Sequence, residues 1–457
     1  MTDTGSLLAK VVGPEHVLME DHVPEEYGHD ESLTVAARRA RYVVRPAATA
    51  EVSEILAVAA AQRVPVTARG SGTGLCGACV PSTDGIVVSF ERMNHVVEID
   101  ADNHVAVVQP GVTLAELDDH AAEFGLCYPV RPGESSASVG GTIATNAGGM
   151  HAVRHGVTRH HVLGVEAVLA SGSIVRSGGK YVKTSTGYDL TQLLVGSEGT
   201  LALVTEATLR LKPRGGQSAT VLAPFATAEE ITRAVPRLLA TGVDPLVLEY
   251  VDMLTMAAMT AQQDLGLGIP QQVRDTALAY LVVVLEGQSA ERLEADVESL
   301  GGQLLELGAA DVYVLPATAA RQLIEARERA FWASKAAGAD EIVDIVVPRA
   351  SLPRLFAAAD VIAGDSGSIV TGCGHAGDGN VHLAVFQPDG QRRDKVLRRL
   401  FRAGTELGGA ISGEHGIGTA KKRYFLELED PAKVELMRRI KHAFDPDGIL
   451  NPGVLFD

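Results

Sequence analysis

The chain has 457 residues, of which 46% are hydrophobic and 21% are charged, and its formal net charge is −17. This length favours two or three domains, because a single hydrophobic core rarely extends past roughly 250 to 300 residues. The acidic balance and the absence of a basic stripe argue against a nucleic-acid-binding surface.

Helical and strand-like patterns alternate through the first third of the chain. Helices are expected at 50–62 and 113–124, and strands at 64–67, 85–89 and 201–211. Three glycine-dense segments interrupt this pattern, at 69–77, 132–149 and 196–199. Lys212-Pro213 ends the last strand, so we place the first domain boundary near Pro213 to Gly216.

The pattern changes after residue 218. Strands are expected at 220–223, 278–286, 341–347 and 368–372, and helices at 228–240, 290–300, from Leu315 through Trp332, and at 431–444. A tail rich in helix breakers, DPDGILNPG, follows the last helix. The fold class predicted from this order is α+β, with an antiparallel sheet covered by helices in the second part of the chain.

The segment Gly72 to Gly77 satisfies the pattern G-x-G-x-x-G, which alone is a weak signal. A dinucleotide-binding Rossmann loop leads directly into a helix, but here Pro81 and Asp84-Gly85 come first and the next segment, IVVSF, is strand-like. No G-K-[ST] follows any glycine loop, which excludes a P-loop as well. Two interpretations remain, a tight turn between strands or a loop of backbone N–H groups, headed by Arg69, that holds an anion such as pyrophosphate.

The run PGESSASVGGTIATNAGG, residues 132–149, consists almost entirely of small or hydroxyl residues, which let the backbone approach a flat ligand. This run, ARGSGTGL and GSEGTLALVTEATLRLKP together resemble the three FAD-contacting segments of the vanillyl-alcohol oxidase superfamily, over about residues 41–213. The resemblance implies a PCMH-type FAD-binding domain. Some members of the superfamily bind FAD covalently through His or Cys, but no such residue stands out here, so we expect noncovalent FAD. It implies FAD contacts from Arg69, Gly70, Ser71, Gly72, Thr73, Gly74, Leu75, Pro132, Ser138, Gly141, Thr142, Thr145, Asn146, Gly149, Glu198, Thr200, Val204, Asn380 and Asn451.

Cys76 and Cys79 form a C-x-x-C pair within the first of these segments. A redox motif and half of a metal site are the functional alternatives. No second cysteine pair or histidine cluster accompanies the pair, and it does not begin a helix. We therefore interpret both cysteines as small loop residues. With only four cysteines the chain has no disulfide framework, which suits a reducing compartment.

The segment GHAGDGNVHL, residues 374–383, carries two histidines seven residues apart. Asp-Gly between β runs favours a hairpin with a two-residue loop. If Asp378 and Gly379 form that loop, His375 pairs directly with His382, with Cβ atoms roughly 4.5 to 5.5 Å apart. Two imidazoles at that separation reach one metal ion.

A third ligand is available in SGEHGIG, residues 412–418. Glu414 would complete a His₂Glu site with one position open for substrate, and the adjacent His415 would remain free to act as a base. A satisfied structural histidine is the alternative for any one of these residues. That alternative is weak for three histidines and a glutamate among so many glycines.

These C-terminal motifs resemble those of the branch that contains D-lactate dehydrogenase, the glycolate oxidase flavin subunit and D-2-hydroxyglutarate dehydrogenase, as does the tail KHAFDPDGILNPG. The resemblance implies that His375, His382 and Glu414 bind a divalent metal, Zn²⁺ or Mn²⁺, and that His415 is the general base. The domains expected are an FAD-binding domain at 1–215, a substrate or cap domain at 216–410, and a segment at 411–457 that returns to the flavin.

Arg327 lies where this branch places its carboxylate-binding arginine, and a bidentate guanidinium suits a carboxylate. The alternative is an ordinary helix-surface residue, because Arg321 and Arg329 are close by. The hydroxyglutarate enzymes usually carry a lysine just before the residue that corresponds to Asp344, where this chain reads Glu-Ile-Val-Asp. This difference favours a monocarboxylate such as lactate or glycolate.

The function expected is oxidation of a small D-2-hydroxy acid to the 2-keto acid, with hydride transfer to flavin N5. The sequence does not select the electron acceptor, and the candidates are oxygen, a quinone, a cytochrome and an iron–sulfur partner. It is also compatible with a homodimer. D-2-hydroxyglutarate dehydrogenase, a metallohydrolase, an electron-relay subunit and an alkylglycerone-phosphate-synthase-like transferase are the alternatives. No basic segment followed by an apolar core opens the chain, and no apolar run approaches ~20 residues, so we expect a cytoplasmic protein, with attachment to a membrane through a partner left open.

Overall fold

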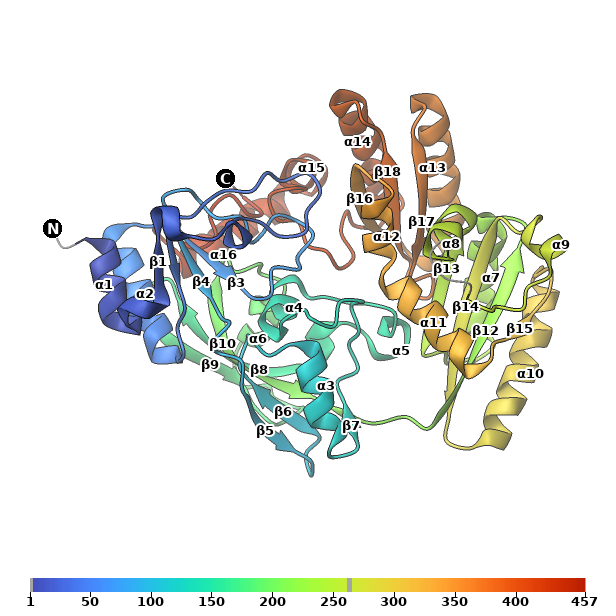
Figure 1. Cartoon of the computed structure of the whole chain (residues 1–457), viewed down its shortest axis with the longest axis horizontal. Helices are drawn as coiled ribbons and strands as arrows, with labels where there is room; N and C mark the ends of the chain where they lie inside the picture. Colours follow the sequence, from blue (N-terminus) through green and yellow to red (C-terminus); the bar gives the residue numbers. More distant parts are fainter. Residues whose placement is uncertain (1–2, 261–264, 457) are drawn as a thin grey trace.

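The computed structural model describes residues 3–260 and 265–456 and has two lobes (Figure 1). The first lobe contains the sheets formed by strands β1 to β11, and the second contains the sheet formed by β12 to β18. The predicted boundary near Pro213 to Gly216 falls between β11 and β12, where the chain passes from one lobe to the other. Within the described residues no helix is long and apolar enough to span a membrane.

A four-stranded sheet with the order β1-β2-β4-β3 begins the first lobe. β1 is antiparallel to β2, and the other neighbours are parallel. Helices α1 and α2 pack on this sheet through Leu8, Ile55 and Leu56, whose side chains are fully buried. The bounds are α1 Thr4–Val12, β1 Val17–Met19, β2 Tyr42–Val44, α2 Thr49–Gln62, β3 Val66–Arg69 and β4 Ile86–Ser89.

A five-stranded antiparallel sheet, β5-β6-β10-β8-β9, and a small β7-β11 pair complete the first lobe. Helix α3 begins at a capping box in which Thr113 and Glu116 satisfy each other's backbone N–H groups. The bounds are β5 Val96–Asp100, β6 Val105–Val108, α3 Leu114–Ala122, β7 Leu126–Cys127, α4 Val139–Thr145, α5 Ala152–His155, β8 Val162–Leu169, β9 Ile174–Gly178, α6 Leu190–Leu194, β10 Ala202–Arg210 and β11 Lys212–Pro213.

The second lobe is built on a seven-stranded sheet, β15-β12-β14-β13-β17-β18-β16, in which every neighbouring pair is antiparallel. This confirms the predicted antiparallel sheet. The strands are β12 Gln217–Phe225, β13 Val247–Asp252, β14 Ala279–Gly287, β15 Tyr313–Val314, β16 Glu341–Val346, β17 Ile369–Gly374 and β18 Asn380–Phe386. The helices are α7 Ala228–Ala240, α8 Met253–Thr260, α9 Gln271–Arg274, α10 Ala290–Glu306, α11 Ala317–Glu328, α12 Ala330–Ala336, α13 Leu352–Ser366 and α14 Gly390–Glu406.

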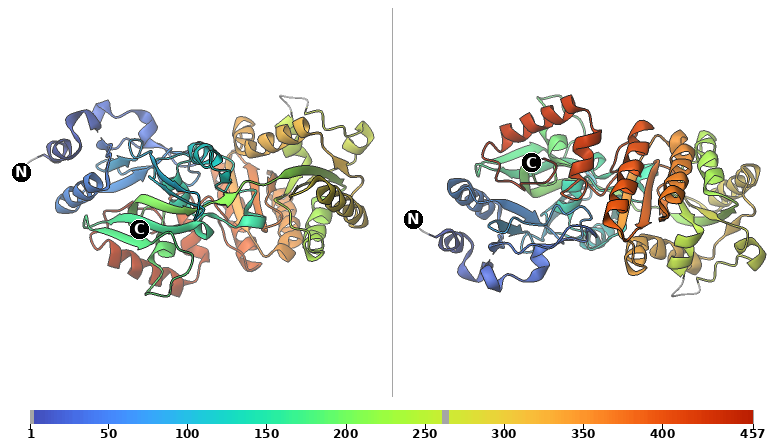
Figure 2. Two further views of the ribbon diagram at one scale, coloured as in Figure 1. Left: turned by 90° about the horizontal axis from the view of Figure 1, so that it is seen from below. Right: turned by 90° about the horizontal axis from the view of Figure 1, so that it is seen from above.

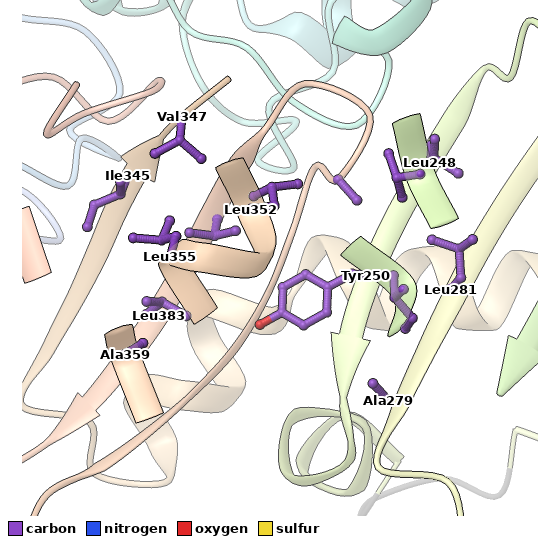
Figure 3. Close-up of a cluster of buried hydrophobic side chains, with 14 of the residues drawn as sticks. Leu248, Tyr250, Ala279, Leu281, Ile345, Val347, Leu352, Leu355, Ala359 and Leu383 are labelled. Atoms are coloured by element: carbon purple, nitrogen blue, oxygen red, sulfur yellow. The ribbon is translucent and has the colours of Figure 1, made fainter. Parts of the chain in front are cut away.

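Both faces of this sheet are buried, which explains its nearly continuous apolar strands. Alternate residues of β13 and β14 enter different cores. Tyr250 and Leu281 pack with residues of α7, α13 and α14, as Figure 3 shows in part. Val251 and Val282 pack on the other side with residues of α8 and α11.

The chain end returns to the first lobe. After α15 (Lys422–Leu428), helix α16 (Pro431–Phe444) lies over that lobe (Figure 2), where Ile440 and Phe444 contact its core. The Val66 N–H then donates to Ile449 O (2.7 Å) and the Asn451 N–H to Val66 O (2.7 Å), so the tail runs beside β3. The predicted single helix from Leu315 through Trp332 is instead two helices, α11 and α12, which meet at Arg329.

Candidate active site

A cavity in the first lobe encloses about 1320 Å³, including space open to solvent. Its walls come from the loop after β3, the segment that leads into α4, the start of β10 and the returning tail. No Lys or Arg of the described residues lines it. An anionic group there would therefore be held by backbone N–H groups and by the hydroxyl side chains of the lining. The predicted cofactor-binding residues that line it are Gly70, Ser71, Gly72, Thr73, Gly74, Leu75, Pro132, Ser138, Gly141, Thr142, Thr145, Glu198, Val204 and Asn451.

Five predicted cofactor-binding residues lie outside this wall: Arg69, Asn146, Gly149, Thr200 and Asn380. The Arg69 guanidinium is buried and donates to His29 O (2.6 Å). The Asn380 amide donates to Asp344 Oδ1 (2.7 Å) and Ile345 O (3.0 Å). These two side chains support neighbouring segments instead of facing the cavity.

The glycine motifs are packed so closely that side chains would not fit. A Cβ on Gly70 would lie 1.9 Å from Ser138 Oγ, and Gly418 has a φ of +55° with Cys76 O 2.0 Å from such a Cβ. The buried Glu198 carboxylate accepts the N–H groups of Ile417 (2.8 Å) and Gly418 (2.7 Å). All three glycine motifs and the EHGIG segment therefore meet at one cavity, and its small-residue walls fit a large flat cofactor.

Three side chains of the second lobe converge on one point. His375 Nε2 lies 3.1 Å from Glu414 Oε1 and 3.2 Å from His382 Nε2, and His382 Nε2 lies 3.1 Å from Glu414 Oε1. Ligands about 2.1 Å from a tetrahedral metal ion are separated by roughly 3.4 Å. The three side chains thus fit one metal ion, and within the described residues they form the one group of this kind.

The hairpin that brings the two histidines together differs from the prediction. Cys373, not His375, pairs with His382, and residues 375–379 form the connection between β17 and β18. His375 lies in this loop, where its carbonyl accepts the Asp378 N–H (2.9 Å). The predicted direct pairing of His375 with His382 is therefore wrong, although the imidazoles do meet.

Each histidine has a buried carboxylate behind it. His375 Nδ1 lies 2.6 Å from Glu249 Oε1, and His382 Nδ1 lies 3.7 Å from Asp344 Oδ1. Metal-binding histidines usually pair their second ring nitrogen with a carboxylate, which fixes the tautomer. Burial by itself would lower the pKa of His375, but Glu249 and Glu414 raise it to about 10. A divalent cation would relieve this concentration of negative charge.

Asp344 holds the segment that carries Glu414 and His415. Its fully buried Oδ2 accepts the Ser412 hydroxyl (2.8 Å) and the N–H groups of Gly413, Glu414 and His415 (2.9, 2.9 and 2.8 Å). Burial opposes ionisation, but His415 and His382 keep the pKa of Asp344 below its usual range. One carboxylate thus fixes the backbone from which two candidate site residues project.

His415 stacks on His382, with ring centroids 4.9 Å apart and planes inclined by 12°. Burial lowers the pKa of His415 to about 4, so the imidazole is neutral near pH 7. Its backbone neighbour Glu414 points to the metal site. The structure therefore brings the predicted base beside the predicted ligands without making it one of them.

A second cavity of about 640 Å³, including space open to solvent, adjoins the first. It is lined by His375, His382, Glu414, His415 and Arg327, so it brings all the predicted metal and catalytic residues together. Glu414 and His415 line both cavities, as do Leu75 and Pro132. Arg327 is buried, with Nη2 2.6 Å from Glu249 Oε2, while its Nε makes no hydrogen bond within the described residues.

Comparison with known families agrees with this geometry. Residues 216–455 match the family described as FAD linked oxidases, C-terminal domain, and residues 40–178 match an FAD binding domain. The chain belongs to the FAD-linked oxidases. This membership shows FAD binding and oxidoreductase chemistry, and it confirms the predicted superfamily and α+β fold.

Curated relatives of this FAD-linked oxidase cover nearly its whole length. An uncharacterized FAD-linked oxidoreductase of Mycobacterium tuberculosis is 54% identical over 100% of this chain and 99% of its own. D-lactate dehydrogenase of Archaeoglobus fulgidus is 39% identical (94% and 95%), and the glycolate oxidase subunit GlcD of Bacillus subtilis is 36% identical (91% and 88%). The solved 4-ethylphenol oxidase of Gulosibacter chungangensis shares the fold, with a TM-score of 0.79 at 18% identity over 99% of this chain and 96% of that one.

The C-x-x-C pair of this oxidase does not have the environment of a reactive redox motif. Cys76 is fully buried, and burial raises the pKa of both Cys76 and Cys79, the latter to about 12. Reactive thiols have the opposite shift. Both cysteines line the larger cavity, in agreement with their interpretation as small loop residues.

The sequence interpretation missed Glu249, which contacts both His375 and Arg327. A signal was present, because Glu249 is the one charged residue in the apolar run LVLEYV. A charge in a strand buried on both faces needs a charged or hydrogen-bonding partner. Which partner it meets depends on contacts across about 80 to 130 residues of chain, which strand patterns do not reveal.

Proposed function

We propose that this FAD-linked oxidase converts a small D-2-hydroxy acid to the 2-keto acid. The observation that carries the proposal is the position of His415 on the wall of both cavities, beside the metal-type triad and within the same cavity as Arg327. Relatives named D-lactate dehydrogenase and glycolate oxidase support this substrate class and the D configuration. His375, His382 and Glu414 are the proposed metal ligands.

Arg327 is proposed to bind the substrate carboxylate. The Arg327 side chain lines the smaller cavity, while Glu249 holds one side of its guanidinium. A buried, charge-assisted hydrogen bond of this kind both orients and selects an anion. The bound acid would then present its C2 toward the cavity that His415 and Glu414 also line.

His415 is proposed to remove the proton of the C2 hydroxyl. Its lowered pKa leaves it neutral before the reaction, and its stacking on His382 keeps the ring in place. FAD, when bound, accepts the hydride, and a divalent metal ion held by the triad would supply Lewis acidity for the hydroxyl.

Anaerobic mixing of the holoenzyme with D- and L-2-hydroxy acids, followed by flavin bleaching, tests the proposal. D-acids should bleach the flavin. His415→Ala should retain FAD but bleach at least 100-fold more slowly, because general-base catalysis typically contributes that much. His375→Ala should lose bound metal and bleaching rate together. If no hydroxy acid bleaches the wild type, or if His415→Ala bleaches at the native rate, the proposal is wrong.

A further inference from the structure

The smaller cavity continues past the metal-type triad along two paired strands. Asp344 pairs with His382, and two residues farther along the same strands Ile342 pairs with Ala384. Residues two apart share a face of the sheet and lie roughly 6.6 to 6.8 Å apart. Ile342 and Ala384 therefore form the wall that a substrate side chain meets when it extends from the triad along the strands, and both line the cavity.

Other residues of the cavity lining are also apolar. Phe331, from α12, and Met150, from the segment before α5, face the same cavity. Ala384 contributes only a small side chain to the cavity lining. The cavity encloses about 640 Å³, a figure that includes space open to solvent.

Charge in this cavity also limits the substrate. Arg327 is the one Lys or Arg among the described residues that line it, and Glu249 already neutralises part of its charge. Glu328 adds a carboxylate to the wall. A second carboxylate on the substrate would lose water without gaining a cation, which is strongly unfavourable.

We infer that the substrate is a 2-hydroxy monocarboxylate with an apolar side chain longer than methyl, in the range of four to six carbons overall, and that Ile342, Ala384 and Phe331 determine this preference. The inference rests on the proposed function and narrows it. Burial of one methylene is worth about 0.8 kcal/mol, or roughly fourfold in kcat/KM. This value per methylene predicts that kcat/KM is at least tenfold higher for D-2-hydroxyisocaproate than for D-lactate.

A substrate series tests the preference. Stopped-flow bleaching with D-lactate, D-2-hydroxybutyrate, D-2-hydroxyisocaproate and D-2-hydroxyglutarate should give kcat/KM values that rise through the first three acids and fall at least 100-fold for the last. Titration calorimetry of the matching 2-keto acids into oxidised holoenzyme should give the same order of affinity without turnover. A preference for lactate or for hydroxyglutarate in both measurements overturns the inference.

Ala384→Val tests the wall directly by filling the space beside Ile342. We expect at least a tenfold loss of kcat/KM for hydroxyisocaproate and less than a threefold loss for lactate, with FAD content unchanged. Ala257→Val, on the exposed side of α8 and outside the cavity, is the matched control and should change neither value. Equal losses for both acids in Ala384→Val would show that the wall does not select the side chain.

The substrate series gives different results if the inferred side-chain preference is wrong and if the proposed function is wrong. If the short acids bleach the flavin but the longer ones do not, the enzyme is a hydroxy acid oxidoreductase and the inferred side-chain preference is wrong. If none of the four acids bleaches the flavin, the proposed function itself is wrong.

Discussion

Glu249 is a single buried carboxylate that contacts both the metal-type triad and the predicted carboxylate-binding arginine. Its two oxygens lie 2.6 Å from His375 Nδ1 and 2.6 Å from Arg327 Nη2. Burial opposes its ionisation, yet Arg327 and His375 lower the pKa of Glu249. A fully buried ion of this kind is tolerated only because both oxygens face cationic or hydrogen-bonding partners.

Glu249→Gln is predicted to weaken both sites. Glutamine has one oxygen and one amino group, so it cannot serve His375 and Arg327 together. Metal affinity should fall about 10- to 100-fold, as is typical when the partner of a ligating histidine is lost, and KM for the hydroxy acid should rise. Elemental analysis after dialysis against a chelator measures the first effect, and flavin bleaching measures the second.

Glu286→Gln is the matched control, because Glu286 lies on the neighbouring strand β14 but pairs with Arg154 away from the cavity. Glu286→Gln should keep its bound metal and should leave KM for the hydroxy acid unchanged. If Glu249→Gln behaves like this control while keeping its FAD, Glu249 does not position the two sites.

At the scale of elements, the hairpin between β17 and β18 shows what local sequence can predict. Asp378-Gly379 correctly indicated a turn between strands. In the structure the turn runs from Ala376 to Gly379, whose N–H donates to Ala376 O (3.4 Å), and Gly377 N–H donates to Leu248 O (3.1 Å) on β13. The contact with β13 is a long-range constraint that the dipeptide does not encode, so the predicted register was wrong.

The tail after α16 is another element whose role depends on distant partners. Asn451 has a φ of +45°, and its amide donates to Glu198 O (2.8 Å) and Ala78 O (3.0 Å). It therefore joins two cofactor-cavity loops that are more than 100 residues apart in sequence. The breaker-rich tail predicted an irregular end, but only the resemblance to known flavoproteins indicated that it reaches the flavin.

Asn451→Ala is predicted to weaken FAD binding at least tenfold. The variant leaves two buried carbonyls without a donor and places alanine in a left-handed conformation that it disfavours. Release of flavin on dilution, followed by fluorescence, measures the change. Asn103→Ala, whose amide contacts only the exposed Asp100 loop, should retain FAD like the wild type. Equal retention by both variants would contradict the role assigned to the tail.

At the scale of the whole molecule, the candidate site is assembled from distant segments of both lobes. Motif spacing predicted the candidate ligands that the structure brings together, and periodicity predicted helices such as 228–240 and 431–444 at their observed bounds. The supporting carboxylates Glu249 and Asp344 were not predicted. Their roles arise from pairings between β13, β16, β17 and β18 that no local pattern specifies.

The segment 151–161 of the first lobe contacts the second lobe, and three of its histidines have lowered pKa values. Arg154 forms ion pairs with Asp244 and Glu286 of the second lobe. Burial lowers the pKa of His151 and His161 to about 4 and, with help from Lys212, that of His155 to about 3. His151, His155 and His161 therefore stay uncharged over a pH range in which an unfolded chain would protonate them.

Stability should consequently decrease as the pH falls from about 6.5 toward 4. In this range the unfolded histidines, with pKa values near 6.5, bind protons that the folded ones do not, so each contributes up to about 1.4 kcal/mol per pH unit to the slope of the unfolding free energy.

His161 is 2% exposed and its Nε2 lies 2.9 Å from His155 O, a contact that a glutamine amide is able to replace. His161→Gln should reduce the slope between pH 4.5 and 6 by about that amount in urea unfolding. Above about pH 7.5 the two slopes should coincide, because histidines that are neutral in both states bind no protons. Identical slopes at pH 4.5 to 6 would mean that His161 is protonated in the folded protein and that the segment 151–161 tolerates its charge.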